Sequence, residues 1–274
     1  MDVLIRSNHD EMSLCAARIV AALVREKPNA VLGLPTGSTP IGTYKELIRM
    51  HREEGLDFSG VTTFNLDEYL GIGKDMSKPY TEDQSYARFM WEEFYKSIEI
   101  PPEQTHIPDG LTKNPDASCV EYEEAIRQAG GIDLQVLGIG SNGHWGFNEP
   151  GTPLASRTHI VTLTQQTLDD NWELFYSKAG GRREDMPHFA LTMGVGTILE
   201  ARHIVMLAAG KRKANIVARA LEGPLTSQVT ASAVQLCPGR VTVILDEKAA
   251  TKLANIDYYR HVERVKAQYH TELG

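Results

Sequence analysis

A glycine-rich stretch brings a histidine and a glutamate close together in the sequence. It reads Gly138-Ile-Gly-Ser-Asn-Gly-His-Trp-Gly-Phe-Asn-Glu-Pro150 and follows an apolar run that begins at Leu134. Glycine and proline at this density exclude a regular helix, so we expect a tight loop after a buried strand. Open α/β sheets bind ligands on such loops. His144 and Glu149 are therefore candidates for acid–base chemistry, with a surface turn carrying two solvated side chains as the alternative.

Two further strand ends carry residues suited to an anion. The apolar segment 30–34 runs into Pro35-Thr-Gly-Ser-Thr-Pro40, where we expect a helix to begin with Thr39 as its cap. Backbone N–H groups at a helix start bind anions, although an ordinary strand-to-helix turn uses the same residue types. Basic residues in Gly210-Lys-Arg-Lys213 lie at another such turn, where a solvated helix start is the alternative.

Asp67 and Glu68 follow a third apolar segment, residues 61–65. Adjacent side chains of an extended chain point to opposite faces, so one carboxylate can face a cleft while the other makes structural bonds. Two solvated acids at a loop start are the alternative. A carboxylate together with a carboxylate-paired histidine suits proton transfer at carbon and oxygen. Because no metal-binding spacing occurs, the residues predict a metal-independent acid–base enzyme acting on a sugar phosphate.

Bulk composition limits the classes of protein. The 274 residues are expected to form a single α/β domain over residues 1–274, and 42% hydrophobic with 23% charged residues is typical of a globular protein. A net charge of -8 without a basic run argues against a nucleic-acid partner. No apolar run approaches a membrane span and no signal-peptide pattern occurs, so we expect a cytoplasmic protein. The cysteines, expected to be reduced, are Cys15, Cys119 and Cys237.

Strand-like and helix-like segments alternate along the chain, which predicts a doubly wound, mostly parallel sheet flanked by helices. The expected strands are 2–6, 30–34, 61–65, 134–139, 203–208 and 240–245; the expected helices include 10–27, 85–97, 117–128 and 256–270. Residues 154–163 are expected to form an edge strand. The polar stretch 164–187 breaks the pattern, and we expect it to act as a lid.

The motifs together resemble the glucosamine-6-phosphate deaminase family over nearly the whole chain. The matching stretches are Leu34-Pro-Thr-Gly-Ser-Thr-Pro40, Phe64-Asn-Leu-Asp-Glu-Tyr69, Gly140-Ser-Asn-Gly-His-Trp-Gly-Phe-Asn-Glu-Pro150, Leu154-Ala-Ser-Arg-Thr158, Ala190-Leu-Thr-Met-Gly-Val-Gly-Thr197 and Gly210-Lys-Arg-Lys213. The resemblance implies a Rossmann-like fold and a small-molecule amino sugar phosphate as substrate. It implies conversion of glucosamine 6-phosphate and water to fructose 6-phosphate and ammonia without a cofactor. It also allows a homo-oligomer, since the family includes hexamers and smaller assemblies.

The resemblance also implies a role for each candidate residue. His144 would open the pyranose ring, Glu149 would hold its imidazole in the working tautomer, and Asn142 would orient by hydrogen bonds. Asp67 would carry the C2 proton to C1. The residues that match the phosphate site are Thr36, Gly37, Ser38, Thr39 and Lys213.

Two departures from the family pattern generate hypotheses. Several members carry an arginine on the lid that clamps the phosphate, and the aligned residue here is Glu173, which would repel a phosphate. We expect a replacement cation from Lys178, Arg182 or Arg183; a related amino sugar, or one without phosphate, is the alternative. Allosteric members use basic residues where this chain has His159 and Val161, so we expect no activation by N-acetylglucosamine 6-phosphate.

Two rival functions stay open at this point. A 6-phosphogluconolactonase-like enzyme would need no base at C2, so the intact Asp67 argues against it. A non-catalytic sugar-phosphate sensor would not need the retained His144 and Glu149, but the Glu173 change keeps it open.

Overall fold

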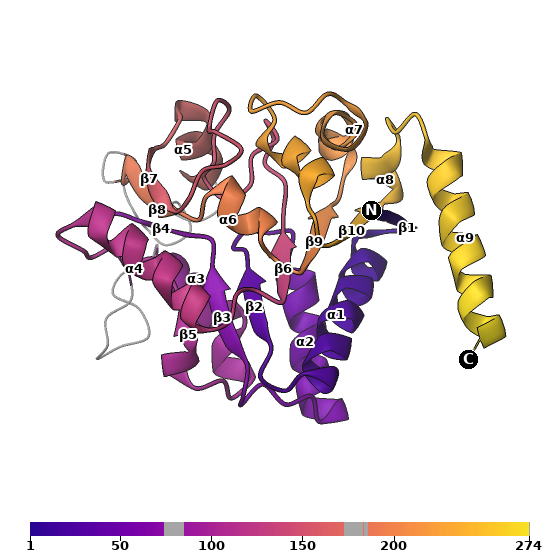
Figure 1. Cartoon of the computed structure of the whole chain (residues 1–274), viewed down its shortest axis with the longest axis horizontal. Helices are drawn as coiled ribbons and strands as arrows, with labels where there is room; N and C mark the ends of the chain where they lie inside the picture. The colour runs from indigo at the N-terminus through magenta and orange to yellow at the C-terminus, as the bar shows by residue number, and fades with distance from the viewer. Residues whose placement is uncertain (74–84, 173–182, 184–185, 274) are drawn as a thin grey trace.

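Seven parallel strands form the central sheet of the computed structural model, which describes residues 1–73, 85–172, 183 and 186–273 (Figure 1). The strand order is β1-β10-β9-β6-β2-β3-β5. The strands are β1 (Asp2–Arg6), β2 (Val31–Leu34), β3 (Thr62–Asn65), β5 (Thr105–His106), β6 (Leu134–Leu137), β9 (His203–Ala208) and β10 (Arg240–Asp246). The predicted doubly wound parallel sheet is confirmed.

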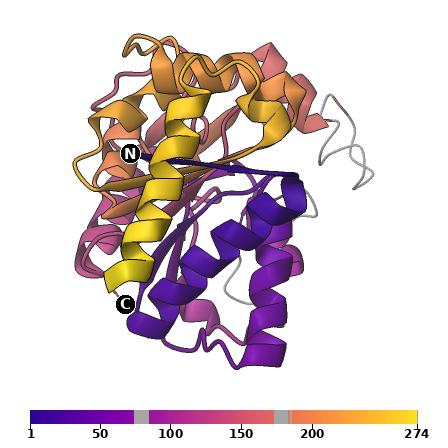
Figure 2. The ribbon, with the colours of Figure 1, turned by 90° about the vertical axis from the view of Figure 1, so that its right-hand side faces the viewer.

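Helices cover both faces of this sheet (Figure 2). One buried cluster joins the sheet to α1 (His9–Glu26), α2 (Ile41–Glu54) and α3 (Tyr86–Glu93). A second joins its other face to α4 (Pro115–Gln128), α6 (Val195–Leu199), α7 (Ala214–Glu222) and α8 (Glu247–Ala250). Helix α1 shows why such segments form, because Asn8 caps its N-terminus and its buried residues Met12, Ala16 and Val20 recur at helical spacing.

Four short 3-10 helices complete the connections within the described residues. They are η1 (Tyr95–Ser97), η2 (Pro102–Gln104), η5 (Lys211–Lys213) and η6 (Thr230–Leu236). The helix expected over 85–97 is interrupted between α3 and η1, since Phe94 leaves helical geometry with φ -143 and ψ -62. Helix α2 begins at Ile41 with Pro40 in the cap position and no side-chain cap, so the expected capping role of Thr39 is wrong.

A second, antiparallel sheet was not expected from the sequence. Its order is β4-β8-β7, with β4 (Asp67–Tyr69), β8 (Phe189–Thr192) and β7 (His159–Thr162). The expected edge strand within 154–163 is thus confirmed over the range of β7. Asp67 lies in a strand and not in a loop, because β4 pairs with Thr192 and its neighbours far along the chain. No local sequence pattern predicts a pairing between strands so far apart in the chain.

The order of the strands places four of the sequence motifs at one edge of the sheet. From β2 the chain builds outward through β3 to β5, and from β6 it builds outward through β9 to β10. The switch point therefore lies between β2 and β6, where open α/β sheets bind ligands. The loops after β2, β3, β6 and β9 all begin at the carboxyl ends of neighbouring strands.

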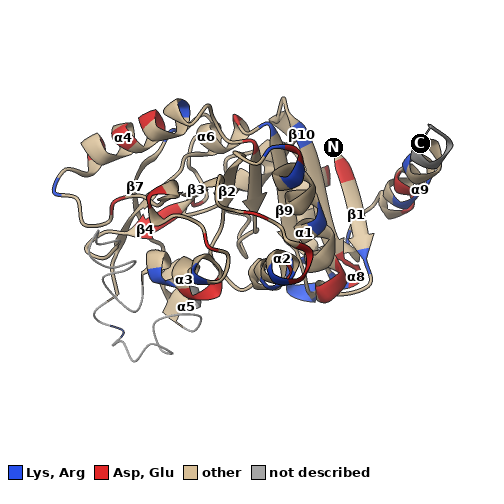
Figure 3. Cartoon of the chain, turned by 90° about the horizontal axis from the view of Figure 1, so that it is seen from below, with Lys and Arg blue, Asp and Glu red and all other residues tan. Residues whose placement is uncertain are grey.

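Part of the expected lid is a helix, α5 (Gln165–Asn171), which begins at the cap Thr164. The last helix, α9 (Ile256–Leu273), lies along the edge strand β1, to which the ion pair between Arg6 and Glu263 joins it at 2.8 Å. Acidic and basic segments both occur along α4 and α9 (Figure 3). Within the described ranges, no helix combines the length and apolarity needed to cross a membrane.

Candidate active site

A cavity at the switch point brings most of the predicted site residues together. Its wall contains the turn 35–40, Asp67, His144 and Lys213. Asn142 and Glu149 are not part of the wall, but both contact His144 and they contact each other. The other lining residues are Leu66, Tyr86, Gly138, Ile139, Gly140, Ser141, Gly146, Phe147, Thr167 and Asn171.

The turn after β2 and Lys213 form the basic and donor-rich part of the cavity. Gly37 has φ 103, a left-handed conformation that favours glycine, and so allows the sharp turn into α2. The Lys213 ammonium donates to the carbonyl of Ile139 at 2.7 Å, which holds it beside the loop after β6. An ammonium near a hydroxyl-rich turn at a helix start suits a phosphate.

Asp67 and Glu68 divide their roles between the two faces of β4, as the sequence predicted. Glu68 is fully buried and accepts hydrogen bonds from the backbone N–H groups of Tyr69, Tyr86 and Ala87 at 2.9 to 3.0 Å. It thereby fastens the start of α3 to β4. Burial raises the pKa of Glu68 to about 8, although its N–H donors act in the opposite direction.

Asp67 faces the cavity, and no described residue donates a hydrogen bond to its carboxylate. It is only 5% exposed, and burial raises the pKa of this carboxyl from 3.8 to about 7. A carboxylate with a pKa near neutrality is matched to general-base work at physiological pH.

His144 and Glu149 form the second reactive group. His144 Nδ1 lies 3.6 Å from Glu149 Oε2, too long for a hydrogen bond, and it is buried without a hydrogen-bond partner among the described residues. The Asn142 amide donates to the same carboxylate oxygen at 3.0 Å, and its own carbonyl accepts the backbone N–H of His144 at 3.2 Å. Asn142 therefore links both members of the pair, as its expected orienting role requires.

The ionisation of Glu149 follows from its surroundings. Burial acts to raise the pKa of this carboxyl, but His144, Thr167 and Asn142 outweigh it and hold the pKa at about 2. Glu149 is therefore charged at neutral pH. Its negative charge favours the tautomer of His144 that carries hydrogen on the facing Nδ1. That arrangement leaves Nε2 to exchange a proton with a ligand.

Three cavity residues were not selected by the sequence reasoning. Tyr86 was assigned to the core, and Thr167 and Asn171 fell in a stretch without a recognisable pattern. The Asn171 amide donates to the Tyr69 hydroxyl at 2.8 Å. The Tyr69 hydroxyl in turn lies 3.2 Å from the Tyr86 hydroxyl. Helical spacing within 164–171 could have revealed α5, but nothing local reveals which of its residues face the cavity.

The expected lid cations are only partly testable. Lys178 and Arg182 lie outside the described residues, as does Glu173. Arg183 is exposed and forms an ion pair with Asp169. Its guanidinium is therefore engaged on α5.

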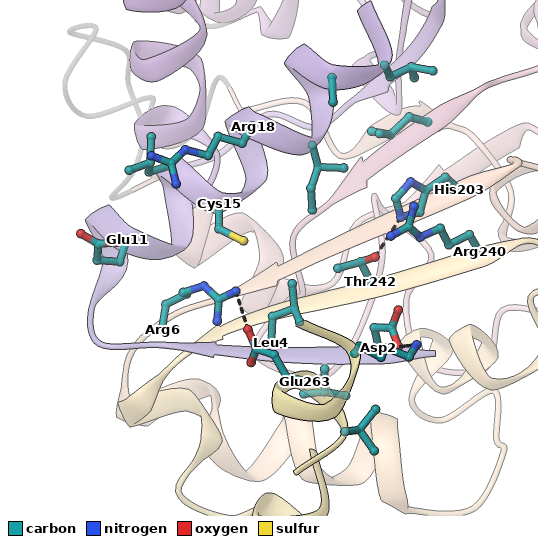
Figure 4. A pocket seen from close by; sticks show the side chains of 18 of the residues that line it. Asp2, Leu4, Arg6, Glu11, Cys15, Arg18, His203, Arg240, Thr242 and Glu263 are labelled. Carbon is teal, nitrogen blue, oxygen red and sulfur yellow. Dashed lines mark hydrogen bonds and ion pairs between the residues drawn. The ribbon is translucent and has the colours of Figure 1, made fainter. Parts of the chain in front are cut away.

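A second and larger cavity lies beside the edge strand β1 and is lined by α1 and α9 (Figure 4). It measures about 1020 Å³ against about 190 Å³ for the cavity at the switch point. Its wall includes residues along the length of β1 and the first residues of β9 and β10, and Cys15 lies there near Arg6 (Figure 4). Ligands of open α/β sheets bind at the carboxyl ends of the strands. We therefore assign the active site to the cavity at the switch point, although the other cavity is larger.

No group of three or more histidine, cysteine, aspartate or glutamate side chains in the described part of the chain could hold a metal ion. Fold and cavity together define a class of protein: an open parallel α/β protein whose switch-point cavity joins a hydroxyl-rich turn and a lysine to a raised-pKa carboxylate and a histidine–glutamate pair. That class fits acid–base chemistry on a phosphorylated small molecule.

Comparison with known proteins gives the family. The sequence model described as glucosamine-6-phosphate isomerases/6-phosphogluconolactonase matches residues 8–243, and the chain belongs to this family. A glucosamine-6-phosphate deaminase of Thermoanaerobacter pseudethanolicus is 47% identical over 257 residues, which cover 94% of this chain and 97% of that protein. One from Cellvibrio japonicus is 45% identical over 274 residues, and both chains are covered completely.

Solved structures agree with this assignment. A structure described as a monomeric glucosamine-6-phosphate deaminase has a TM-score of 0.84 and 43% identity, covering 92% of this chain and all of that one. A 6-phosphogluconolactonase from Trypanosoma cruzi has a TM-score of 0.71 at 20% identity, covering 92% of this chain and 97% of that one, and shares the fold.

The contact between Gly140 and His144 generates one prediction. A Cβ at Gly140 would lie 2.3 Å from His144 Nε2, so in Gly140→Ala the ring must retreat by roughly 1 Å to reach ordinary contact. We expect the NMR signals of the His144 ring to shift. Gly138→Ala is the control, because a Cβ there meets nothing within 4 Å. Unshifted ring signals in Gly140→Ala would contradict this geometry.

The burial of Asp67 generates a second prediction. The pKa of Asp67 is raised from 3.8 to about 7 in the folded state. As the pH rises from 4 to 7, the free energy of unfolding therefore falls by about 1.4 kcal/mol for each pH unit. Asp67→Asn should therefore be more stable than the wild type at pH 8 and equal to it, or nearly so, at pH 4. Urea unfolding at both pH values measures the difference.

The control for this prediction is the exposed Asp57, whose pKa is lowered by the backbone N–H of Ser59. Its ionised form is favoured by folding, so Asp57→Asn should bring no gain at pH 8. If Asp67→Asn raised the free energy of unfolding equally at pH 4 and pH 8, the charge of Asp67 would not be the origin of the stabilisation.

Proposed function

We propose that this protein is a glucosamine-6-phosphate deaminase that converts glucosamine 6-phosphate and water to fructose 6-phosphate and ammonia. The observation that carries the proposal is the cavity in which a carboxylate with a pKa of about 7, a histidine–glutamate pair and an anion-binding turn meet. The deaminase relatives, at 45 to 47% identity over nearly the full chain, support the same reaction.

The chemistry begins with ring opening. His144 takes the proton of the anomeric hydroxyl and returns it to the ring oxygen, while Glu149 stabilises the imidazolium that forms between the two transfers. Asn142 donates to the Glu149 carboxylate and accepts the backbone N–H of His144, so it holds the two residues in a fixed relative position. The product of this step is the open-chain aldehyde.

Isomerisation and loss of ammonia follow. Asp67 removes the C2 proton to give an enolamine and returns the proton to C1, which leaves a ketone-level imine at C2. Water adds to that carbon, ammonia leaves, and fructose 6-phosphate results. Burial of Asp67 supports this role, because a carboxyl of pKa about 7 is a stronger base than an exposed aspartate.

Phosphate binding is assigned to the turn Thr36, Gly37, Ser38 and Thr39 with Lys213. The cation that replaces the family's lid arginine stays a prediction, as do a single domain over 1–274, a cytoplasmic location and any homo-oligomer. The relative with a solved structure is described as monomeric. A lactonase reaction is less well supported, because it leaves the buried base Asp67 without a task.

Ammonia release tests the function. We expect the wild type to release ammonia from glucosamine 6-phosphate with saturation at millimolar or lower concentrations. Asp67→Asn should lose at least about a thousandfold in kcat, since it cannot take the C2 proton. Lys213→Ala should raise KM for glucosamine 6-phosphate at least about tenfold. Galactosamine 6-phosphate and glucosamine are the comparison substrates; a preference for either would refute the assigned substrate.

Regulation provides a separate test. We expect N-acetylglucosamine 6-phosphate to leave the kinetics unchanged, because the basic positions used by allosteric relatives are His159 and Val161 here. The neighbouring Arg157 is already paired with Glu123 and Glu200, which further reduces its availability to an anion. Substrate saturation curves with and without the effector check this expectation. Sigmoidal curves that the effector makes hyperbolic would disprove it.

A further inference from the structure

We propose that Thr167 is a positioning residue for ring opening that acts through Glu149. The inference rests on the proposed function and deepens it, because it assigns part of the ring-opening machinery to helix α5. Thr167 is 4% exposed, and it belongs both to the wall of the cavity and to the contacts of Glu149.

The two oxygens of Glu149 have different partners. Oε2 faces His144 Nδ1 at 3.6 Å and accepts the Asn142 amide at 3.0 Å, both within the loop after β6. Oε1 accepts the hydroxyl of Thr167, 18 residues away on α5, and that of Thr164 at 3.1 Å. The orientation of the carboxylate is therefore fixed by donors on two separate segments.

Thr167 differs from Thr164 in what its hydroxyl does for the helix. Thr164 caps α5 by accepting the backbone N–H of Thr167 at 3.2 Å, so its replacement would weaken the helix itself. The hydroxyl of Thr167 has no capping task and donates to Glu149. Its removal leaves the cap in place and leaves Oε1 of Glu149 with the bond from Thr164 alone.

The expected consequence is confined to one chemical step. Without the Thr167 hydroxyl, Oε1 keeps only the bond from Thr164, so the Glu149 carboxylate is held less firmly and Oε2 is less often opposite Nδ1 of His144. Proton transfer to the ring oxygen then slows, whereas removal of the C2 proton by Asp67 is untouched. Because hydrogen bonds to charged groups are stronger than those between neutral groups, we expect kcat/KM to fall about tenfold or more.

Deuterium at C2 of glucosamine 6-phosphate separates the two steps. In the wild type we expect the C2 step to limit the rate at least in part, and hence a primary isotope effect above one on ammonia release. In Thr167→Val, which keeps the shape and loses the donor, ring opening becomes limiting and the isotope effect falls toward one. Thr167→Ser keeps the donor and should retain both the rate and the isotope effect.

Thr197→Val is the matched control. Thr197 is 2% exposed and its hydroxyl donates to Glu123 at 2.6 Å, so the variant removes a part-buried threonine–glutamate bond outside the cavity. We expect its isotope effect to equal that of the wild type. Thr167→Ala provides the same test if Thr167→Val does not fold.

The outcomes are separable from those of the proposed function. A wild type that releases no ammonia overturns the proposed function and this inference with it. A wild type that turns over, together with a Thr167→Val variant that is slower at an unchanged isotope effect, overturns only the inference. Equal losses in Thr167→Ser and Thr167→Val would also overturn it, because the hydroxyl would then not be responsible.

Discussion

Parallel pairing of β2 with β6 at the centre of the sheet is the constraint on which the site depends. Gly33 lies opposite Gln135 in this pair, and a Cβ at Gly33 would come within 1.9 Å of the Gln135 side chain. The glycine thus leaves the space that the buried glutamine occupies. Because the two strands adjoin, the turn 35–40 after β2 and the loop with His144 after β6 open into the same cavity.

Burial then sets the chemistry of that cavity. Asp67 is buried and receives no hydrogen bond from the described residues, so its pKa is raised, whereas Glu149 is buried with several donors, so its pKa is lowered. Two carboxyl groups of similar intrinsic acidity thereby differ in pKa, and the difference suits the one proposed as a base and the other proposed as a fixed charge. The burial of Asp67 lowers the free energy of unfolding at neutral pH, and the stability of the surrounding core offsets this loss.

The antiparallel sheet adds what the parallel sheet cannot supply. It places Asp67 at the cavity while Glu68, on the opposite face, holds the start of α3 and so the position of Tyr86. Helix α5 follows β7 directly and closes the same side through Thr167 and Asn171. Segments from the whole length of the chain therefore contribute to one small volume.

Sequence alone determined the alternation of strands and helices, the loops at the strand ends, and the candidates Asp67, His144 and Glu149, because hydrophobic periodicity and glycine content act locally. It also indicated that Asp67 and Glu68 face opposite ways, since that follows from an extended backbone. Only the tertiary structure decided that Asp67 belongs to a second sheet, that Thr167 contacts Glu149, and that Tyr86 faces the cavity and not only the core. These features arise from contacts between residues far apart in the chain, whose free energy no local pattern records.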